Sequence, residues 1–589
     1  MSDTVSGHSP QTAQSSQSAH SSQGTQSSQS AQTPRRLADE YVDRLVDLDP
    51  LVATALGRRP GDDALPDLSP DGQQARDDLA RDVLGRLTAM AGTAADDPAE
   101  ARCARLLRER LEAGLAASDA GEHLRTVRNI FGPPQSVRQM FSMMPVSTPE
   151  DWTVVARRMA RVGEAYAGYA ASLREGSSRG LHAAPLQVST LAGQLDDWLA
   201  AGGGRGWFAT FADDAPDDLP AGVRTALDDG AVRAARATEE LRTFLREEYL
   251  PAADGTPDAV GADRYRITSR VATGADLDLE EAYAWGWQEY RRIQAEMQVE
   301  TRRVLPGATP LEAMAHLDAN GEAVDGEDAV RERLQRMMDD AMADLDGTHF
   351  DIADPIKVVE ARIAPPGSAA APYYTRPTLD FSRPGRTWLP TMGRSRFPLW
   401  NLVSTWYHEG VPGHHLQLAQ WAYVAPQLST YQTTIGSISA NTEGWALYAE
   451  RLMDELGYLH DAGARLGYLD AQMMRAVRVV IDIGMHLRLP VPADADAHAG
   501  ETWTPQLARE FFGAHSGREP AFLDSEIVRY LGWPGQAISY KLGERAWLAG
   551  REQARARRGS GFDLKAWHMA ALSTGSLGLD DLTEELAAL

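Results

Sequence analysis

Hydrophobic residues recur at helical spacing through the first half of the chain. In residues 37–48 the leucines and the tyrosine fall three or four positions apart, which is the pattern of a helix with one apolar face. The same spacing runs through 280–305 and 328–345. Short polar stretches rich in glycine and proline separate such segments. The pattern predicts an N-terminal helical region over residues 36–350.

The spacing changes near residue 351. Alternating and β-branched residues then predict short strands separated by turns. The predicted strands are 356–366, 372–381 and 386–392. Helical spacing returns after Pro398. We therefore expect a mainly α protein, in which a large helical body carries a small β-sheet at 351–400, followed by a second helical region at 401–589.

The first 35 residues differ from the rest in composition. They are rich in serine and glutamine and contain almost no large apolar side chains, so they cannot bury enough surface to offset the entropy cost of ordering. They also lack the charged start and the apolar core of a signal peptide. Residues 1–35 are expected to form a disordered tail.

Charge and cysteine content argue against several classes of protein. The chain has 58 Lys and Arg residues against 83 Asp and Glu residues, a net charge of −25, and so acidic a chain repels nucleic-acid phosphates. Its one cysteine permits no intramolecular disulfide, which suits the cytoplasm. There is no apolar run of about 18 residues, the length that a membrane span needs. We expect a cytoplasmic protein without nucleic-acid or membrane partners, and its oligomeric state stays open.

The segment WYHEGVPGHHLQL, residues 406–418, begins like a zinc-protease helix. His408 and Glu409 stand side by side, as in H-E-x-x-H, but Pro412 occupies the position of the second histidine. Across an unbroken helix the next histidine, His414, would point away from His408. An unbroken helix of the H-E-x-x-H type therefore cannot bring these two histidines to one metal ion.

A break in the helix would allow both histidines to bind one metal ion. Pro412 lacks an N–H group and clashes with the carbonyl four residues back, and the glycines on both sides of it permit unusual dihedral angles. We predict an irregularity here that returns His414 to the side of His408, with His415 as the alternative ligand or a contact behind the ligands. The other interpretation is a helix–turn–helix junction with incidental histidines.

A catalytic zinc ion has three protein ligands and an open position for water. The segment 440–457 supplies the third ligand, for which we favour Glu443, while Glu450 is the alternative or orients a histidine. Glu409 beside a metal-activated water is placed to act as the general base. The alternative interpretation of each glutamate is a charged residue on a solvent-exposed helix face, with no functional role.

Several segments resemble the DUF885 family, a bacterial family related to the thermolysin-type (gluzincin) zinc metallohydrolases. They are FPLWNLVSTWYHEGVPGHHLQ, TEGWALYAERLMDELG, RYLGWPGQAISYKLGERA, GPPQSVRQMFSMMP and LDFSRPGRTWLP. The likeness covers most of residues 36–589. It implies a mainly helical fold around a zinc cleft, with His408, one histidine of the pair 414–415 and Glu443 as ligands and Glu409 as the base.

Another helical segment, 472–490, carries a polar stripe. Arg475, Arg478, Asp482 and His486 are spaced by three or four residues and share one face. Asp482 can orient His486, which is a candidate for bonding a substrate or an oxyanion. A structural ladder of ion pairs explains the stripe equally well.

The C-terminal region supplies candidates for the rest of the site. By resemblance to thermolysin-like enzymes, Tyr540 is the candidate donor to the oxyanion, with a core tyrosine as the rival interpretation. Arg529 and Tyr530 are candidates for holding a substrate carboxylate. Arg383, in the SRPG turn, is a weaker candidate for the same role.

These observations predict a zinc-dependent hydrolase of amide bonds. We favour a peptidase acting on short or unfolded peptides. The alternatives are a hydrolase of a non-peptide amide or ester on the same site, and a non-catalytic helical binding protein on a decayed protease scaffold. Retention of Glu409, the expected base, argues against decay.

Overall fold

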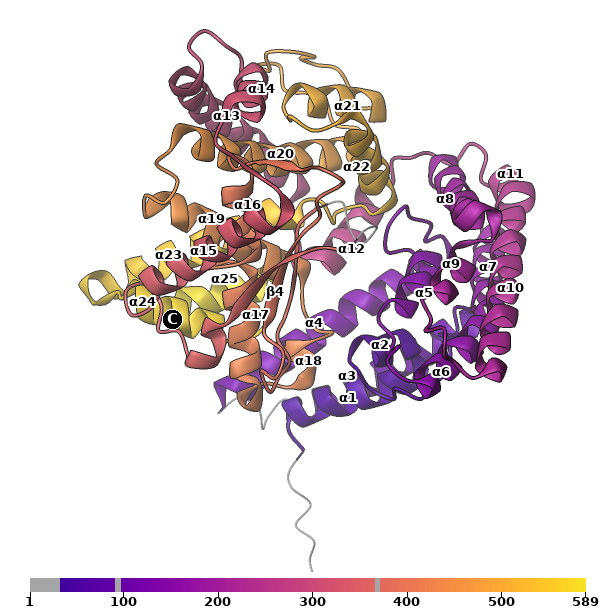
Figure 1. The fold of residues 1–589 in the computed structure, drawn as a ribbon. Helices are drawn as coiled ribbons and strands as arrows, with labels where there is room; N and C mark the ends of the chain where they lie inside the picture. Colours follow the sequence, from indigo (N-terminus) through magenta and orange to yellow (C-terminus); the bar gives the residue numbers. More distant parts are fainter. Residues whose placement is uncertain (1–31, 91–96, 366–370) are drawn as a thin grey trace, which may run out of the picture. The chain divides into compact units, whose positions relative to one another are not determined.

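The computed structural model describes residues 32–90, 97–365 and 371–589. Nearly all of the expected N-terminal tail, residues 1–31, lies outside the described residues. The rest of the chain, Thr33–Leu589, forms one compact unit. The prediction of a mainly α fold is confirmed (Figure 1).

Helices account for most of the first 350 residues. They are α1 (Pro34–Leu48), α2 (Pro50–Ala55), α3 (Pro70–Ala89), α4 (Pro98–Asp119), α5 (Pro133–Phe141), α6 (Pro149–Ala160), α7 (Val162–Ser178), α8 (Pro185–Gly204), α9 (Trp207–Asp213), α10 (Ala221–Phe244), α11 (Leu250–Ala252), α12 (Ala262–Thr273), α13 (Leu279–Val304), α14 (Pro310–Asn320) and α15 (Glu327–Leu345).

Many of these helices begin at a proline that follows a capping residue. In α6, the Thr148 hydroxyl accepts from the Asp151 N–H, and the Asp151 carboxylate accepts from the Thr148 N–H. Proline at the first helical position loses no hydrogen bond, because that N–H has no intrahelical partner. The cap satisfies donors that the first turn leaves free. Ten helices among the described residues begin at a proline, so a proline in this sequence often marks a helix start.

In the part of the chain that the structure describes, five short strands form two small sheets. β1 (Ala323–Asp325) pairs antiparallel with β5 (Arg396–Pro398). β4 (Gly385–Leu389) lies between β2 (Val359–Ile363), parallel to it, and β3 (Tyr373–Thr375), antiparallel to it. Four of the five strands fall just before the histidine motif, where a sheet was predicted. β1 precedes them, and its three residues are too few to produce an alternating pattern.

The second helical region carries the histidine motif. Its helices are α16 (Leu402–Glu409), α17 (His414–Tyr423), α18 (Thr430–Thr433), α19 (Ser439–Glu455), α20 (Ala462–Leu487), α21 (Pro505–Ala514), α22 (Pro520–Gly532), α23 (Ser539–Arg558), α24 (Leu564–Leu572) and α25 (Leu579–Ala588). In the described residues no helix has the length and apolarity that a bilayer span requires.

The buried apolar side chains form two clusters. The smaller cluster lies between Val127 and Tyr249 and is built largely from α5 to α10, among which α6, α7 and α10 pack together. The larger cluster contains the buried residues of α13, α19, α20 and α23. Helix α20 is buried around its whole circumference from Gly463 to His486, except at Arg465. Polar side chains on such a helix need partners inside the protein.

Candidate metal centre

The predicted break in the histidine helix is present. Helix α16 ends at Glu409 and α17 begins at His414. Gly413 lies so close to the preceding helix that a Cβ atom there would stand 1.9 Å from the carbonyl oxygen of His408. Its N–H donates to the Tyr407 carbonyl at 3.0 Å. Only glycine fits this position, and the tight turn folds the start of α17 back toward the end of α16.

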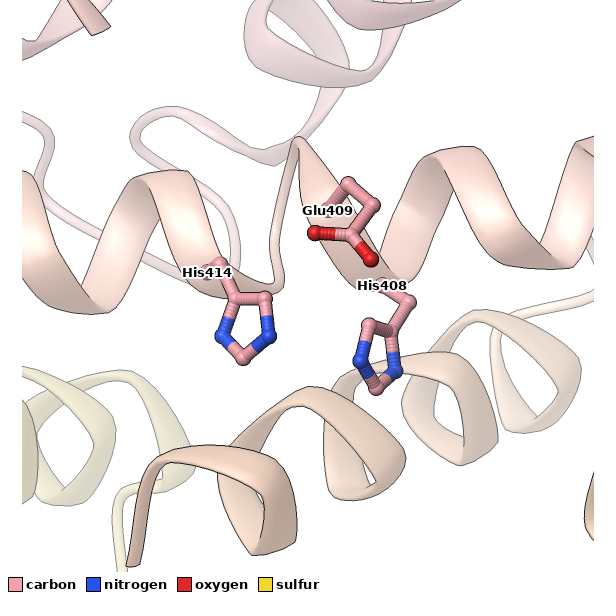
Figure 2. Close-up of side chains that lie close together, drawn as sticks. All are labelled: His408, Glu409 and His414. Atoms are coloured by element: carbon pink, nitrogen blue, oxygen red, sulfur yellow. The ribbon is translucent and has the colours of Figure 1, made fainter. Parts of the chain in front are cut away.

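The turn brings His408, Glu409 and His414 together. One ligand atom from each of the three side chains lies within 4.8 Å of the others, and the two imidazole centroids are 4.8 Å apart. Figure 2 shows both rings on one side of the two helix ends, with the Glu409 carboxylate close by. The two extra residues of the motif are therefore accommodated in the connection between the helices.

Glu443 joins this cluster from α19. Its Oε2 atom lies 3.3 Å from His408 Nε2 and 3.7 Å from His414 Nε2. The next residue, Gly444, packs directly on the backbone of Gly543 in α23, because a Cβ atom at Gly444 would stand 2.4 Å from it. This close approach of α19 and α23 fixes the depth at which the Glu443 carboxylate enters the cluster.

The donor set fits a tetrahedral zinc ion. Two zinc ligands bonded at about 2.1 Å in a tetrahedral arrangement lie about 3.4 Å apart, which agrees with the separations of Glu443 from the two histidines. The nitrogen of His414 that faces Glu443, and that would bind the ion, is Nε2. The other ring nitrogen, Nδ1, is buried without a hydrogen-bond partner among the described residues.

A second layer of polar groups holds His408 from behind. Its Nδ1–H donates to Glu450 Oε1 at 2.8 Å, and the other oxygen of this fully buried carboxylate accepts from the Ser404 hydroxyl. Arg475 approaches the same Glu450 oxygen at 3.4 Å. Because Nδ1 keeps its proton, the lone pair of His408 is on Nε2, facing Glu443. The structure thus gives Glu450 the orienting position of the two roles that the sequence left open.

Burial and charge set the protonation of the cluster. Burial alone would lower the pKa of His408, but hydrogen bonds to Glu443 and Glu450 raise it to about 9. Burial likewise opposes ionisation of Glu443, yet its hydrogen bond with His408 and the charges around it hold its pKa at about 2. A proton on His408 thus occupies the position between the two side chains that a metal ion would take.

Glu409 and His414 are shifted in the opposite directions. Burial, helped by the charges of Glu443 and Glu450 and opposed by those of His408 and Arg475, raises the pKa of Glu409 to about 8. Burial lowers the pKa of His414 to about 4, which keeps it in the neutral form that binds metals. The cluster therefore contains a carboxyl group that can exchange a proton near neutral pH.

His415 is turned away from this cluster. Its Nε2–H donates to the Ile356 carbonyl at 2.7 Å, and its Nδ1 accepts from the Tyr374 hydroxyl at 2.9 Å. Both ring nitrogens are therefore occupied by the strand region. Of the adjacent histidines, His414 lies beside His408, and His415 joins α17 to β3 and to the segment before β2.

The polar stripe on α20 separates into two groups. Arg475 and Arg478 lie beside Tyr540, with their Cζ atoms 6.0 and 5.0 Å from its ring centroid. Glu443 contributes the largest effect on the pKa of Tyr540, raising it, which puts this tyrosine next to the cluster. Tyr540 lies on α23, which packs against α19, the helix that carries Glu443. This packing is consistent with the expected position of Tyr540 beside the site.

The other two stripe residues form a separate buried group. His486 donates from Nε2 to the Tyr530 carbonyl at 3.0 Å and accepts at Nδ1 from the Val260 N–H. Asp482 accepts from the Tyr265 hydroxyl at 2.6 Å and from a backbone N–H. The two side chains are 3.8 Å apart, too far for the hydrogen bond that the sequence suggested. With both nitrogens bonded to backbone, His486 has none left for a substrate.

The arginines proposed for a substrate carboxylate differ in their partners. Arg529 makes two hydrogen bonds to Glu526 and one to Gln536, and Tyr530 donates to Glu526 at 2.6 Å. Arg383 donates to the carbonyl of Pro384 in its own turn and to the carbonyl of Arg376, which follows β3. The sequence analysis did not single out Glu526, although its spacing of three residues from Arg529 is that of a helical ion pair.

The chain is a mainly helical protein in which two histidines and three glutamates form one largely buried cluster. A family model described as "Bacterial protein of unknown function (DUF885)" matches residues 50–586, so the chain belongs to the DUF885 family. No curated protein matches the chain.

Two solved structures share the fold. One is a "putative lipoprotein" from Colwellia psychrerythraea, with 22% identity and a TM-score of 0.80, over 94% of this chain and 98% of that chain. The other is a "putative lipoprotein of unknown function" from Shewanella oneidensis, with 17% identity and a TM-score of 0.72, over 94% of this chain and 99% of that chain. At these identities the likeness concerns the fold alone.

Proposed function

We propose that this protein is a zinc-dependent hydrolase of amide bonds that acts on peptides. The observation that carries the proposal is the convergence of His408, His414 and Glu443 at ligand-to-ligand spacing, with Glu409 beside them. A structural zinc site is normally closed by four strongly bound protein ligands, whereas three ligands and an adjacent base are typical of hydrolytic sites. The relation to gluzincin peptidases proposed from the motifs agrees with this donor set.

His408, His414 and Glu443 would hold the metal. Bound zinc would supply a Lewis acid for the scissile carbonyl and lower the pKa of a water molecule. The positive charge of a cation would also bring the pKa of Glu409 down from its raised value, toward the near-neutral range in which a general base works best.

The chain's own residues divide the remaining work. Glu409 takes the proton of the attacking water and returns it to the leaving amine. Glu450 keeps His408 in the tautomer that presents Nε2, and Arg475 balances the Glu450 charge. Tyr540 is positioned to donate a hydrogen bond to the developing oxyanion. His486 is left out of this mechanism, since both of its nitrogens are already bonded.

The proposal is tested by metal analysis and a peptide digest. Purified protein supplied with zinc is expected to retain about one zinc ion per chain, and a mixed peptide library read by mass spectrometry should show cleavage that a chelator abolishes. A parallel panel of non-peptide amides and esters separates the peptidase from the other hydrolases. Protein that holds no zinc after reconstitution contradicts the proposal. The expectation of a cytoplasmic location stays a prediction.

A further inference from the structure

Tyr540 connects the proposed metal site to a cluster of arginines. The residue is partly exposed. Arg475 links it to the proposed site, because Nη2 of Arg475 lies 3.4 Å from His408 Nδ1 and its Cζ atom lies 6.0 Å from the Tyr540 ring centroid. The Cζ atom of Arg478 is closer, at 5.0 Å from the same centroid. A substrate group that lies along Tyr540 therefore comes close to guanidinium groups.

The arginine cluster carries more positive than negative charge. Arg478 and Arg529 both donate to one carboxylate, that of Glu526, at 2.7 and 2.8 Å. Arg475 has its own partner in Glu450. Two guanidinium groups that share one acid leave one positive charge in excess, in a cluster whose members are all less than a tenth exposed. A buried charge without a counterion is costly, so a site of this kind favours an anionic ligand.

Asp482, four residues after Arg478 on α20, does not remove the excess. It accepts hydrogen bonds from Tyr265 and from a backbone N–H. Burial raises its pKa to about 7, against the lowering effects of these hydrogen bonds and of Arg529. A large fraction of this group is therefore protonated and uncharged at neutral pH.

Arg478 has a donor to spare. Its Nε donates to the Tyr530 hydroxyl at 2.9 Å and its Nη2 to Glu526 at 2.7 Å. Its third nitrogen, Nη1, makes no hydrogen bond to any described residue, and it does not belong to the buried unpartnered atoms, which include Nε and Nη1 of Arg475. Arg529, by contrast, uses all three nitrogens on Glu526 and Gln536. Of these two arginines, Arg478 is the one able to bind a carboxylate.

We propose, resting on the function proposed above, that the enzyme is a carboxypeptidase in which Arg478 binds the free α-carboxylate of the substrate's last residue. That carboxylate lies one residue beyond the scissile bond, about 3.8 Å along the chain, and Arg478 lies beside Tyr540, with its Cζ atom 5.0 Å from the ring centroid. The reaction consumes one water molecule, breaks the last peptide bond and releases the terminal amino acid with a free amino group. Arg478 is a specificity-determining residue in this scheme, and its neighbours hold it in place.

The experiment compares matched peptides with the zinc-loaded full-length protein. The probes are benzoyl-Gly-Phe, its C-terminal amide, and the amide of benzoyl-Gly-Glu, which carries its carboxylate on a side chain. A charged hydrogen-bonded pair of this kind supports a preference on the order of 100-fold in kcat/KM for the free acid. An acetylated hexapeptide with a free C-terminus is expected to lose residues singly from that end.

Variants assign the preference to one side chain. Arg478→Met is expected to lower kcat/KM for the free acid about 100-fold relative to kcat/KM for the amide. Arg478→Lys retains the charge and is expected to lose about tenfold, which keeps the test informative where the methionine variant does not fold. Arg545→Met is the matched control, because Arg545 lies on the same helix as Tyr540 and pairs with Glu281 at the surface.

Several results would overturn the proposal. They are equal kcat/KM for acid and amide in the wild type, internal cleavage of the hexapeptide, efficient cleavage of the Glu-amide probe, or an unchanged preference in both Arg478 variants. Protein that hydrolyses no probe contradicts the proposed function separately. Calorimetric titration with benzoyl-Gly-Phe and its amide then decides the carboxylate site, and a preference for the acid below about threefold overturns it.

Discussion

Two clusters of histidine and carboxylate among the described residues differ in their exposure and in the number of their acids. In the first, around His408 and His414, three glutamates surround two imidazoles. In the second, His486 bonds two backbone groups, and Asp482 accepts two hydrogen bonds on Oδ2 while its Oδ1 has no partner among the described residues. Both lie in helices, but the second is completely buried, whereas the side chains of Glu443 and His414 remain 22% and 12% exposed.

The difference shows which feature distinguishes a candidate metal site from a structural cluster. The two clusters share residue types, so residue type cannot identify function. Several carboxylates crowded together are expensive in a protein interior, and their arrangement becomes favourable when a cation is added. The second cluster holds a single acid, whose pKa burial raises to about 7, and both nitrogens of its histidine are already bonded. The proposed metal site is therefore the first cluster, and we propose a structural role for the second. The predictions below test residues of both clusters.

The largest effect is expected from the adjacent pair His414 and His415. His414→Ala removes a proposed ligand and should reduce zinc affinity by roughly 10³-fold, since about 10–16 kcal/mol of binding is shared among three or four ligands. His415→Ala removes two hydrogen bonds to the strand region and should cost about 1–3 kcal/mol of stability while zinc content stays at the wild-type level. Zinc is measured by mass spectrometry of the metal, and stability by urea unfolding. The reverse pattern would exchange the roles of the two histidines.

The next effect concerns Glu409, which is proposed as the general base and not as a metal ligand. Glu409→Gln retains the shape of the side chain but cannot accept a proton, so turnover should fall by about 10²–10⁴-fold. Zinc binding should persist, which separates the base from the ligands. Glu240→Gln, at an exposed position of α10, serves as the control. Peptide hydrolysis at wild-type rate in the Glu409 variant would remove this residue from the mechanism.

A smaller effect is expected from the group behind His408. Glu450→Gln can still accept one hydrogen bond but no longer stabilises the Nδ1–H of His408 with a full charge, and it leaves Arg475 without its counterion. Loss of such an outer carboxylate typically costs about 10–100-fold in metal affinity. Competition with a chromogenic chelator measures the zinc affinity directly. An affinity equal to that of the wild type would show that Glu450 only fills space.

Much of the fold and part of the site could be read from the sequence, for definable reasons. The helical spacing predicted the mainly α fold, and the β-branched segments located the sheet region, because both depend on local pattern. The break at Pro412 followed from local sterics. The choice between His414 and His415 could not follow, since it depends on Gly413 packing against a carbonyl and on Tyr374 and Ile356 capturing the other ring.

Long-range packing also explains why the sequence did not show that the polar stripe on α20 divides into two groups. Its four polar residues share a face by spacing alone, yet two lie beside Tyr540 and two are held by Tyr530, Val260 and Tyr265. Those partners come from α22, α12 and the segment before α12, more than forty residues away in every case. No periodicity within one helix contains that information.

The smallest effect is expected from Asp482 of the second cluster, and it is tested through the pH dependence of protein stability. The pKa of Asp482 is raised to about 7, chiefly by burial, whereas an aspartate in the unfolded chain titrates near 3.9. Between these values the folded state holds a proton that the unfolded state has released, so the contribution of Asp482 to stability is present at low pH and is lost as pH rises toward 7. Asp482→Asn keeps an acceptor oxygen and never ionises. The stability of the variant relative to wild type should therefore improve by roughly 2–3 kcal/mol between pH 5 and pH 8.

Urea unfolding of both proteins at the two pH values, with chelator present, measures this difference, and titrations common to both proteins cancel in it. A difference that does not change with pH would mean that Asp482 is ionised throughout the range. The second cluster would then hold a buried charge as the first does, and the contrast between a charged cluster and an uncharged one would disappear.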